Sequence, residues 1–176
     1  GPLSLDRVVR IARQAADALD AGHRLGIVHR DFKPDNVLIC RNAEGLEIAK
    51  VVDFGVAKQT QAGMDSNTLT QQGMVLGTPQ YMSPEQLMAE PLDARSDLYS
   101  LAIVVYQMLG GGLPFEGGTP ENQMMRRLIE QPKPLRMLNP AVSPQIEEVV
   151  MRSLARNAVD RHATTVLFAG DLVRAK

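Results

Sequence analysis

Hydrophobic and polar residues alternate with a helical period at the start of the chain. Behind Ser4, one apolar face is formed by residues three or four positions apart, namely Leu5, Val8, Val9, Ala12, Ala15, Ala16 and Leu19. Serine is a favourable N-cap residue, and glycine often ends a helix. The pattern therefore predicts an amphipathic helix that begins after Ser4 and ends near Gly22 or Gly26.

Two short apolar runs, residues 37–40 and 48–52, follow this helix and are separated by the polar stretch 41–45. Short apolar runs joined by a polar turn that contains glycine predict a two-stranded hairpin. Between the helix and the first strand lies a charged segment with one proline, residues 29–36. A polar loop held between two buried elements is a suitable place for chemistry, although a plain charged turn would have the same composition.

The second half of the chain begins with a strongly apolar stretch from Ser96 to Leu109. Because it is apolar around most of its circumference, we expect a buried helix that is capped by Ser96 and stopped by the three glycines 110–112. The β-branched residues 103–105 would also suit a strand, but the total length favours a helix.

Three further helices are expected after this one. A threonine or serine followed by proline predicts helices at about 120–130 and 144–155, and the last helix begins near Thr164 or Thr165. Residues 59–77, by contrast, are polar and lack periodicity, which predicts a long loop. A loop of this length within a compact domain is more often functional than a plain connector. The whole pattern predicts a mainly α fold with one small hairpin.

The bulk composition is that of an ordinary globular protein and argues against several classes of function. The 176 residues are 44% hydrophobic and 22% charged, with a net charge of −1. This charge gives no reason to expect nucleic acid or an anionic membrane as a partner. No apolar run approaches the roughly 20 residues that span a bilayer. The single cysteine, Cys40, cannot form an internal disulfide, so we expect a reducing compartment, the cytoplasm.

The charged loop and a motif after the hairpin carry the candidate chemistry. The loop has the sequence His29-Arg30-Asp31-Phe32-Lys33-Pro34-Asp35-Asn36, and Asp53-Phe54-Gly55 follows the second strand. The first motif resembles the protein-kinase catalytic loop, His-Arg-Asp-Leu-x-x-x-Asn, with phenylalanine in place of leucine, and the second resembles the kinase magnesium motif. The chain is similar to the eukaryotic-type serine/threonine protein kinases and most resembles the bacterial ones.

The resemblance implies an enzyme that transfers the γ-phosphate of ATP to serine or threonine hydroxyls of proteins, with Mg²⁺ as cofactor. Asp31 would orient the attacking hydroxyl or accept its proton, and Lys33 would lie near the transferred phosphate. Asn36 and Asp53 would bind Mg²⁺, an ion that prefers oxygen ligands. By the same resemblance, Lys33, Asn36 and Asp53 hold the nucleotide and its metal, while Thr78 contacts Asp31 and Lys33.

Other residues have structural roles by resemblance. The segment 77–85, Gly-Thr-Pro-Gln-Tyr-Met-Ser-Pro-Glu, is similar to the end of the kinase activation loop and would form the floor for a peptide substrate. Glu85 would pair with Arg161, and Asp97 would hold the backbone of the catalytic loop, which includes the structural residue His29. Taken alone, Asp97 would also fit as a negative charge at a helix N-terminus.

Arg30, which precedes Asp31, implies regulation by phosphorylation. In kinases of this type the arginine needs a counter-charge, which a phosphorylated loop residue can supply. Thr68 and Thr70 are the first candidates, with Ser66 behind them. Each of these hydroxyls fits a plain polar loop residue equally well.

The resemblance covers essentially the whole chain, residues 1–176, but only the C-terminal lobe of a kinase. A glycine-rich loop, a strand lysine with its partner glutamate, and the hinge have no counterpart in these residues. We therefore expect an incomplete kinase domain that has little or no activity in isolation and binds ATP weakly. We also expect an exposed apolar face that binds the N-terminal lobe, another partner or a second copy of the chain.

Two other functions remain as alternatives. The first is a kinase-like docking module without turnover, although the intact Asp31, Asn36 and Asp53 favour an enzyme. The second is a small-molecule phosphotransferase, which is disfavoured because Lys33 and the peptide-binding segment 78–85 would have no purpose there. Protein substrates are therefore the expected partners.

Overall fold

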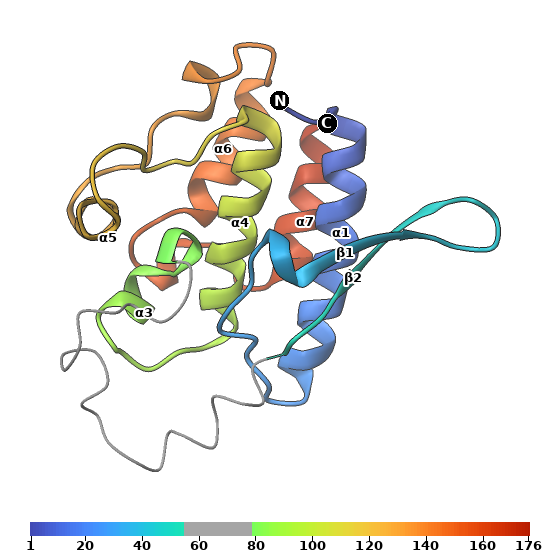
Figure 1. Cartoon of the computed structure of the whole chain (residues 1–176), viewed down its shortest axis with the longest axis horizontal. Coiled ribbons are helices and arrows are strands. Elements are labelled where there is room, and N and C mark those ends of the chain that lie inside the picture. Colours follow the sequence, from blue (N-terminus) through green and yellow to red (C-terminus); the bar gives the residue numbers. More distant parts are fainter. Residues whose placement is uncertain (55–78) are drawn as a thin grey trace.

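Four helices pack against one another at the centre of the computed structural model, which describes residues 1–54 and 79–176. They are α1 (Leu5–Arg24), α4 (Ala94–Gly110), α6 (Pro144–Ser153) and α7 (Thr165–Ala175). The central helix α4 contacts the other three, and α1 also lies against α7 (Figure 1). The prediction of a mainly α fold with one small hairpin is confirmed.

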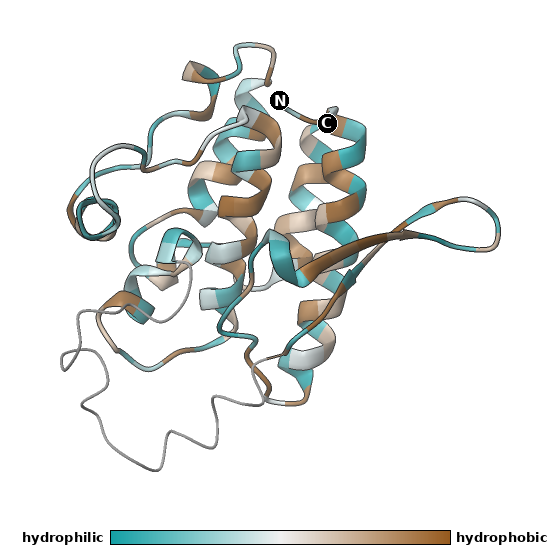
Figure 2. Cartoon of the chain, in the orientation of Figure 1, coloured by the Kyte–Doolittle hydropathy of each residue, from teal (hydrophilic) through white to brown (hydrophobic). Residues whose placement is uncertain are grey.

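α1 buries one apolar face, as its sequence predicts. Val8, Ala12 and Leu19 are fully buried in the core shared with α4 and α7. Figure 2 shows this division of the helix into apolar and polar positions. Ser4 occupies the N-cap position, but its side chain makes no capping hydrogen bond. Asp6 in the first turn places a negative charge where the helix dipole favours it.

α4 begins earlier than the sequence suggested. Asp93 is the N-cap, and its Oδ1 accepts a hydrogen bond from the Arg95 amide at 2.8 Å. The prediction that Ser96 caps the helix is wrong, because Ser96 lies buried in the first turn and its Oγ donates to Glu85 at 2.8 Å. Gly111, in the left-handed conformation with φ of 78°, ends the helix as predicted. The predicted burial of nearly the whole helix is also confirmed.

The predicted hairpin is formed by β1 (Val37–Arg41) and β2 (Glu47–Val51), which pair antiparallel. Oδ1 of Asn42 accepts two backbone hydrogen bonds within the turn. β2 is joined to α1 because the amide of Ala49 donates to the Gln14 side chain at 2.7 Å. The turn of the hairpin projects away from the helices (Figure 1).

The remaining elements surround this core. The proline-initiated helices are confirmed as α5 (Pro120–Ile129) and α6, and the last helix as α7. Hydroxyl groups cap all three by accepting a backbone amide hydrogen bond: Thr119 for α5, Ser143 for α6 and Thr164 for α7.

The sequence did not predict the short helix α3 (Pro84–Leu87) or several single turns of 3₁₀-helix. These turns are η1 (Pro34–Asn36), η2 (Pro79–Tyr81), η3 (Leu135–Met137) and η4 (Ala158–Asp160). The expected loop 59–77 lies outside the described residues. Within residues 1–54 and 79–176, no helix is long and apolar enough to cross a bilayer.

Candidate active site

Asp97 of α4 anchors the loop that precedes β1. Its carboxylate is buried and accepts the backbone amides of His29 at 2.8 Å and Arg30 at 2.9 Å. Nε2 of His23 on α1 donates a third hydrogen bond at 2.7 Å. These donors compensate a carboxylate that would otherwise be costly to bury. One side chain therefore joins α1, α4 and the backbone of the loop.

Arg30 has a strained backbone conformation that its neighbours hold in place. Its φ of 67° lies in the left-handed region, which is unfavourable for a bulky residue. The amide of Arg30 donates to Asp97, and its carbonyl oxygen accepts from Nε2 of Gln86 at 2.6 Å. Because side chains from two other elements bind both polar groups, the surrounding structure fixes the turn that presents Asp31.

Gln86 was not identified from the sequence as a site residue. It occupies the third position of α3, where its side chain accepts the Ser83 amide at 2.9 Å while its own amide donates to Ser83 Oγ at 3.4 Å. This is a capping box, and the spacing of Ser83 and Gln86 is the sequence signal that would have revealed it. The side-chain Nε2 of Gln86 then donates to the carbonyl oxygen of Arg30, so α3 is coupled to the loop 29–36.

His29 connects the loop to the segment that contains Asp53. Its Nε2 donates to the carbonyl oxygen of Val52 at 2.9 Å, and its Nδ1 accepts the amide of Asp31 at 3.4 Å. In this arrangement Nε2 is the donor and Nδ1 the acceptor. The ring also lies 4.9 Å from the ring centroid of Phe54. The buried imidazole is therefore packed between the two motifs.

Asp31, Lys33 and Asn36 lie together in this loop. Nζ of Lys33 is 3.3 Å from Oδ2 of Asp31, and Nδ2 of Asn36 donates to the Asp31 carbonyl oxygen at 2.8 Å. The Val52 amide donates to the carbonyl oxygen of Asn36 at 3.0 Å, which brings Asp53 into the adjacent segment. Asp53 is exposed and has a φ of 58°, a conformation that aspartate tolerates better than most residues.

Asn36 and Asp53 fit a hard divalent cation chemically. The Nδ2 group of Asn36 is used as a donor, so its amide oxygen is the atom suited to a metal, as are the exposed carboxylate oxygens of Asp53. Mg²⁺ is typically bound by one or two protein oxygens together with phosphate groups and water. Residues 1–54 and 79–176 contain no cluster of three His, Cys, Asp or Glu side chains that would form a purely protein metal site.

Glu85 of α3 and Arg161 form a buried ion pair. Nη1 and Nη2 of Arg161 each donate to one carboxylate oxygen at 2.8 Å, and the guanidinium also donates to three backbone carbonyl groups. Burial raises the pKa of Glu85, but the hydrogen bonds and charge of Arg161 outweigh it and leave the pKa below its ordinary value. The guanidinium also lies over the ring of Tyr99, whose pKa burial raises to about 12.

The turn at residues 79–82 lies next to the loop 29–36. Arg30, Asp31 and Phe32 line the same small gap as Tyr81 and Met82. This turn belongs to the expected substrate floor, segment 77–85, of which the structure describes residues 79–85. Polar side chains of α4 and α5 form hydrogen bonds with its residues.

Ser100 and Gln107 of α4 hold the turn through Tyr81. Oγ of Ser100 donates to the Tyr81 carbonyl oxygen at 2.7 Å, and the Tyr81 hydroxyl donates to Gln107 at 2.8 Å. From α5, Arg127 binds three further carbonyl groups of the same turn. Sequence reasoning missed Arg127, because an adjacent pair of arginines on a short polar helix has the pattern of a solvated face.

Four predicted residues lie outside the described part of the chain. They are the candidate catalytic residue Thr78 and the candidate phosphorylation sites Ser66, Thr68 and Thr70.

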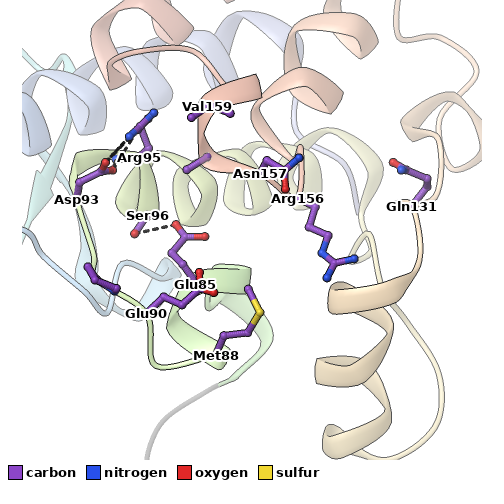
Figure 3. Close-up of a pocket in the computed structure, with 12 residues that line it drawn as sticks. Glu85, Met88, Glu90, Asp93, Arg95, Ser96, Gln131, Arg156, Asn157 and Val159 are labelled. Carbon is purple, nitrogen blue, oxygen red and sulfur yellow. Dashed lines mark hydrogen bonds and ion pairs between the residues drawn. The ribbon is translucent and has the colours of Figure 1, made fainter.

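Two larger cavities lie away from the candidate catalytic residues. One, of about 640 Å³, is polar and is lined by residues that include Glu85, Glu90, Asp93, Arg95 and Arg156 (Figure 3). The other, of about 410 Å³, is mostly apolar and is lined by residues that include Leu3, Ile11, Val37, Ile39, Val104 and Met108. Asp31, Lys33, Asn36 and Asp53 line neither of them.

Comparison with known proteins finds similarity to the protein kinases. Residues 1–171 match the sequence family described as "Protein kinase domain". The chain is 40% identical over 173 residues to the serine/threonine-protein kinase pkn3 of Myxococcus xanthus, which covers 97% of this chain and 32% of that protein. It is 39% identical over 174 residues to the serine/threonine-protein kinase PknB of Mycolicibacterium smegmatis, which covers 99% of this chain and 27% of that protein. The chain thus spans about a quarter to a third of the length of these relatives.

Proposed function

Because the chain belongs to the protein kinase family, we propose that residues 1–176 form the catalytic C-terminal lobe of a serine/threonine protein kinase. The reaction is transfer of the γ-phosphate of ATP to serine or threonine hydroxyls of protein substrates. One observation supports this most strongly: the buried Asp97 carboxylate and Gln86 fix the strained Arg30, and Asp31 lies next to the 79–82 turn.

Asp31 and Lys33 have complementary roles in this proposal. Asp31 accepts or orients the proton of the attacking hydroxyl, a task that requires a carboxylate within hydrogen-bonding reach of the substrate. The Lys33 ammonium group, 3.3 Å from Asp31, places positive charge where the transferred phosphate arrives. Thr78, by resemblance, contacts both residues and completes the substrate side of the site.

Asn36 and Asp53 would hold Mg²⁺ through their side-chain oxygens. When bound, the ion neutralises charge on the phosphates of ATP. The chain contributes the spacing of the two oxygen donors: the hydrogen bond between Val52 and Asn36 joins the backbones of the two segments, and His29 holds them from the buried side. Lys33 completes the set of residues that we assign to nucleotide and metal binding.

The regulatory proposal concerns Arg30. A phosphate group on Thr68, Thr70 or Ser66 would supply a counter-charge for this guanidinium and order the segment that leads to the substrate floor. We also place this lobe in the cytoplasm, a proposal supported by its single cysteine, Cys40.

The apolar cavity beside β1 is our candidate for the contact with the N-terminal lobe. It lies next to the strand on which Leu38 is 53% exposed and Ile39 is 43% exposed, and exposed apolar surface of this kind favours a partner. We expect the isolated chain to self-associate or bind apolar dyes, and to transfer little phosphate from labelled ATP. Sedimentation of a strictly monomeric species with no dye binding would count against this contact.

The decisive test of the proposed function replaces Asp31. In the longest natural form of the protein, Asp31→Asn should lower phosphoryl transfer to a serine/threonine substrate at least about 100-fold, because it removes the proton acceptor. Binding of ATP and of the protein substrate should be retained. The matched control is Asp35→Asn, an exposed carboxylate in the same loop, which should change the rate less than about threefold. Equal phosphoryl transfer by Asp31→Asn and wild type would refute the role of Asp31, whereas substrate binding by both forms with no transfer by either would favour a docking module without turnover.

A further inference from the structure

Arg127 is a buried arginine that binds backbone carbonyl groups of a single turn. It lies on α5 and is 3% exposed. Its Nη1 donates to the carbonyl oxygens of Pro79 at 2.6 Å and Met82 at 2.7 Å, and its Nη2 donates to that of Gln80 at 2.7 Å. The guanidinium therefore gathers three acceptors from four consecutive residues, although Arg127 is more than 40 residues away in the sequence.

The chemistry of these contacts favours arginine specifically. Hydrogen bonds from a charged donor are about twice as strong as those between neutral groups. The planar guanidinium also presents several donors in a fixed geometry, whereas the lysine ammonium is a compact point charge. The ring of Phe115, with its centroid 5.6 Å from the guanidinium carbon, packs against the same group. The guanidinium of Arg127 thus contacts the Phe115 ring and also binds the backbone of the 79–82 turn.

The adjacent Arg126 shows what an ordinary arginine on this helix looks like. Its side chain is 44% exposed, it donates to the carbonyl oxygen of Glu116 at 2.9 Å, and it lies 3.9 Å from the carboxylate of Glu130. None of these contacts involves the 79–82 turn. Arg126 is therefore a surface arginine and Arg127 a buried one, although they are adjacent in the same helical turn. This makes Arg126 a matched control.

The turn that Arg127 binds faces the catalytic aspartate. Tyr81 and Met82 line the same small gap as Asp31, and Ser100 of α4 holds the Tyr81 carbonyl oxygen. Arg127 instead binds the carbonyl groups of Pro79, Gln80 and Met82. Without Arg127 these three acceptors would lose their charged partner, and the turn would be free to shift relative to Asp31.

We propose that Arg127 is a positioning residue that fixes the substrate-binding turn 79–82 and thereby sets the affinity for the protein substrate. The inference rests on the proposed function, since the turn has a substrate only if the chain belongs to an active kinase. Arg127 does not touch the reacting atoms in this proposal. It acts through the backbone of the turn, so its loss should weaken peptide binding more than the chemical step.

Steady-state kinetics of the longest natural form of the protein test this inference, with a serine/threonine peptide and ATP varied separately. Arg127→Met should raise the KM for the peptide at least about tenfold, while kcat and the KM for ATP change less than about threefold. Arg127→Lys should retain more peptide affinity than Arg127→Met, because lysine keeps the positive charge but lacks the planar set of N–H donors. Arg126→Met should behave like wild type. An unchanged peptide KM in Arg127→Met, or an equal rise in the KM for ATP, would overturn the inference.

Hydrogen–deuterium exchange of the 176-residue chain separates this inference from the proposed function. Arg127→Met should speed amide exchange in residues 80–83, while Arg126→Met should leave it unchanged, and thermal melting followed by circular dichroism checks that each variant is folded. If the wild-type protein transfers no phosphate, the proposed function fails, yet faster exchange still supports the anchoring of the turn. Equal exchange in the two variants would refute that anchoring whatever the activity, and Arg127→Lys provides the same comparison if Arg127→Met does not fold.

Discussion

Two backbone segments face each other across the candidate site and are held by opposite charges. The loop 29–36, our candidate catalytic loop, is held by the Asp97 carboxylate, which accepts the amides of His29 and Arg30. The 79–82 turn is held by the Arg127 guanidinium, which donates to three carbonyl oxygens. In both cases a buried charged side chain satisfies backbone groups that a regular helix or sheet would otherwise pair.

The backbone conformation explains which charge each segment needs. The left-handed Arg30 turns successive N–H groups to the same side, which creates a concavity suited to an anion. The turn at 79–82, which contains η2, directs the carbonyl oxygens of Pro79, Gln80 and Met82 to one guanidinium, and grouped carbonyl oxygens favour a cation. The sign of the anchor therefore follows from the local fold of the segment that it holds.

The two anchors also differ in how their own charge is compensated. Asp97 has His23 as a hydrogen-bonding partner at 2.7 Å. Burial lowers the pKa of Arg127, and within the described part of the chain no carboxylate forms an ion pair with it. Carbonyl dipoles and the Phe115 ring compensate it instead. We therefore expect substitution of Arg127 by an apolar residue to be less costly to folding than removal of Asp97.

The largest expected effect concerns α3, whose Gln86 binds the Arg30 carbonyl oxygen and whose Glu85 pairs with Arg161. Arg161→Met leaves the buried Glu85 without its partner and should lower the free energy of unfolding by about 3–5 kcal/mol. Guanidinium chloride unfolding of the chain measures this change. The exposed neighbour Arg156 is the control, since Arg156→Met should cost less than about 0.5 kcal/mol. A loss below about 1 kcal/mol for Arg161→Met would show that the pair does not hold α3.

Removal of the carboxylate anchor should come next. Asp97→Ala leaves the buried amides of His29 and Arg30 without an acceptor, so we expect a loss of about 2–4 kcal/mol in the same unfolding experiment. Arg127→Met, measured alongside it, should cost less. The reverse order would contradict the comparison between the two anchors.

A smaller effect is expected for the link between α3 and the loop 29–36. Gln86→Leu removes the hydrogen bond to the Arg30 carbonyl oxygen and part of the capping box, and should cost about 1–2 kcal/mol. Amide exchange near Arg30 should rise, while exchange within α5 stays constant. Gln131→Leu, at an exposed position, serves as the control. Unchanged exchange at the loop would mean that Asp97 alone fixes Arg30.

The smallest effect lies far from both anchors and depends on pH. Burial and the charge of Arg152 lower the pKa of His162 below 6.5, although Asp171 acts in the opposite direction. A histidine that is neutral in the folded state binds fewer protons than in the unfolded state below pH 6.5. The free energy of unfolding should therefore fall as the pH is lowered from 7.5 to 5.5, and less so in His162→Gln. An identical pH dependence in the variant would assign the effect to other groups.

Residues within local motifs were the predictable part of this site. The periodicity of α1 and α4 and the proline-initiated helices follow from the sequence, and the kinase resemblance pointed to Asp97 and to the pair of Glu85 and Arg161, which the structure places in contact with their partners. These residues stand in recognisable motifs whose spacing is itself informative.

The parts that were missed depend on contacts between distant segments. Ser96 had the residue type of a cap, but tertiary contact with Glu85 buries it and Asp93 takes the N-cap position. Arg126 and Arg127 are indistinguishable as residue types, and only the packing of α5 under the 79–82 turn decides which one is buried. No local pattern carries this information, because the partners are carbonyl groups, which every residue possesses.

Steady-state kinetics of Asp97→Asn and Arg127→Met, in the longest natural form of the protein, test the comparison most directly. Disturbing the carboxylate anchor moves Asp31, so Asp97→Asn should lower kcat at least about tenfold with little change in the KM for the peptide. Disturbing the guanidinium anchor moves the substrate floor, so Arg127→Met should raise the KM for the peptide with little change in kcat. If both variants altered the same parameter to the same extent, the two segments would not be held independently and the account would be contradicted.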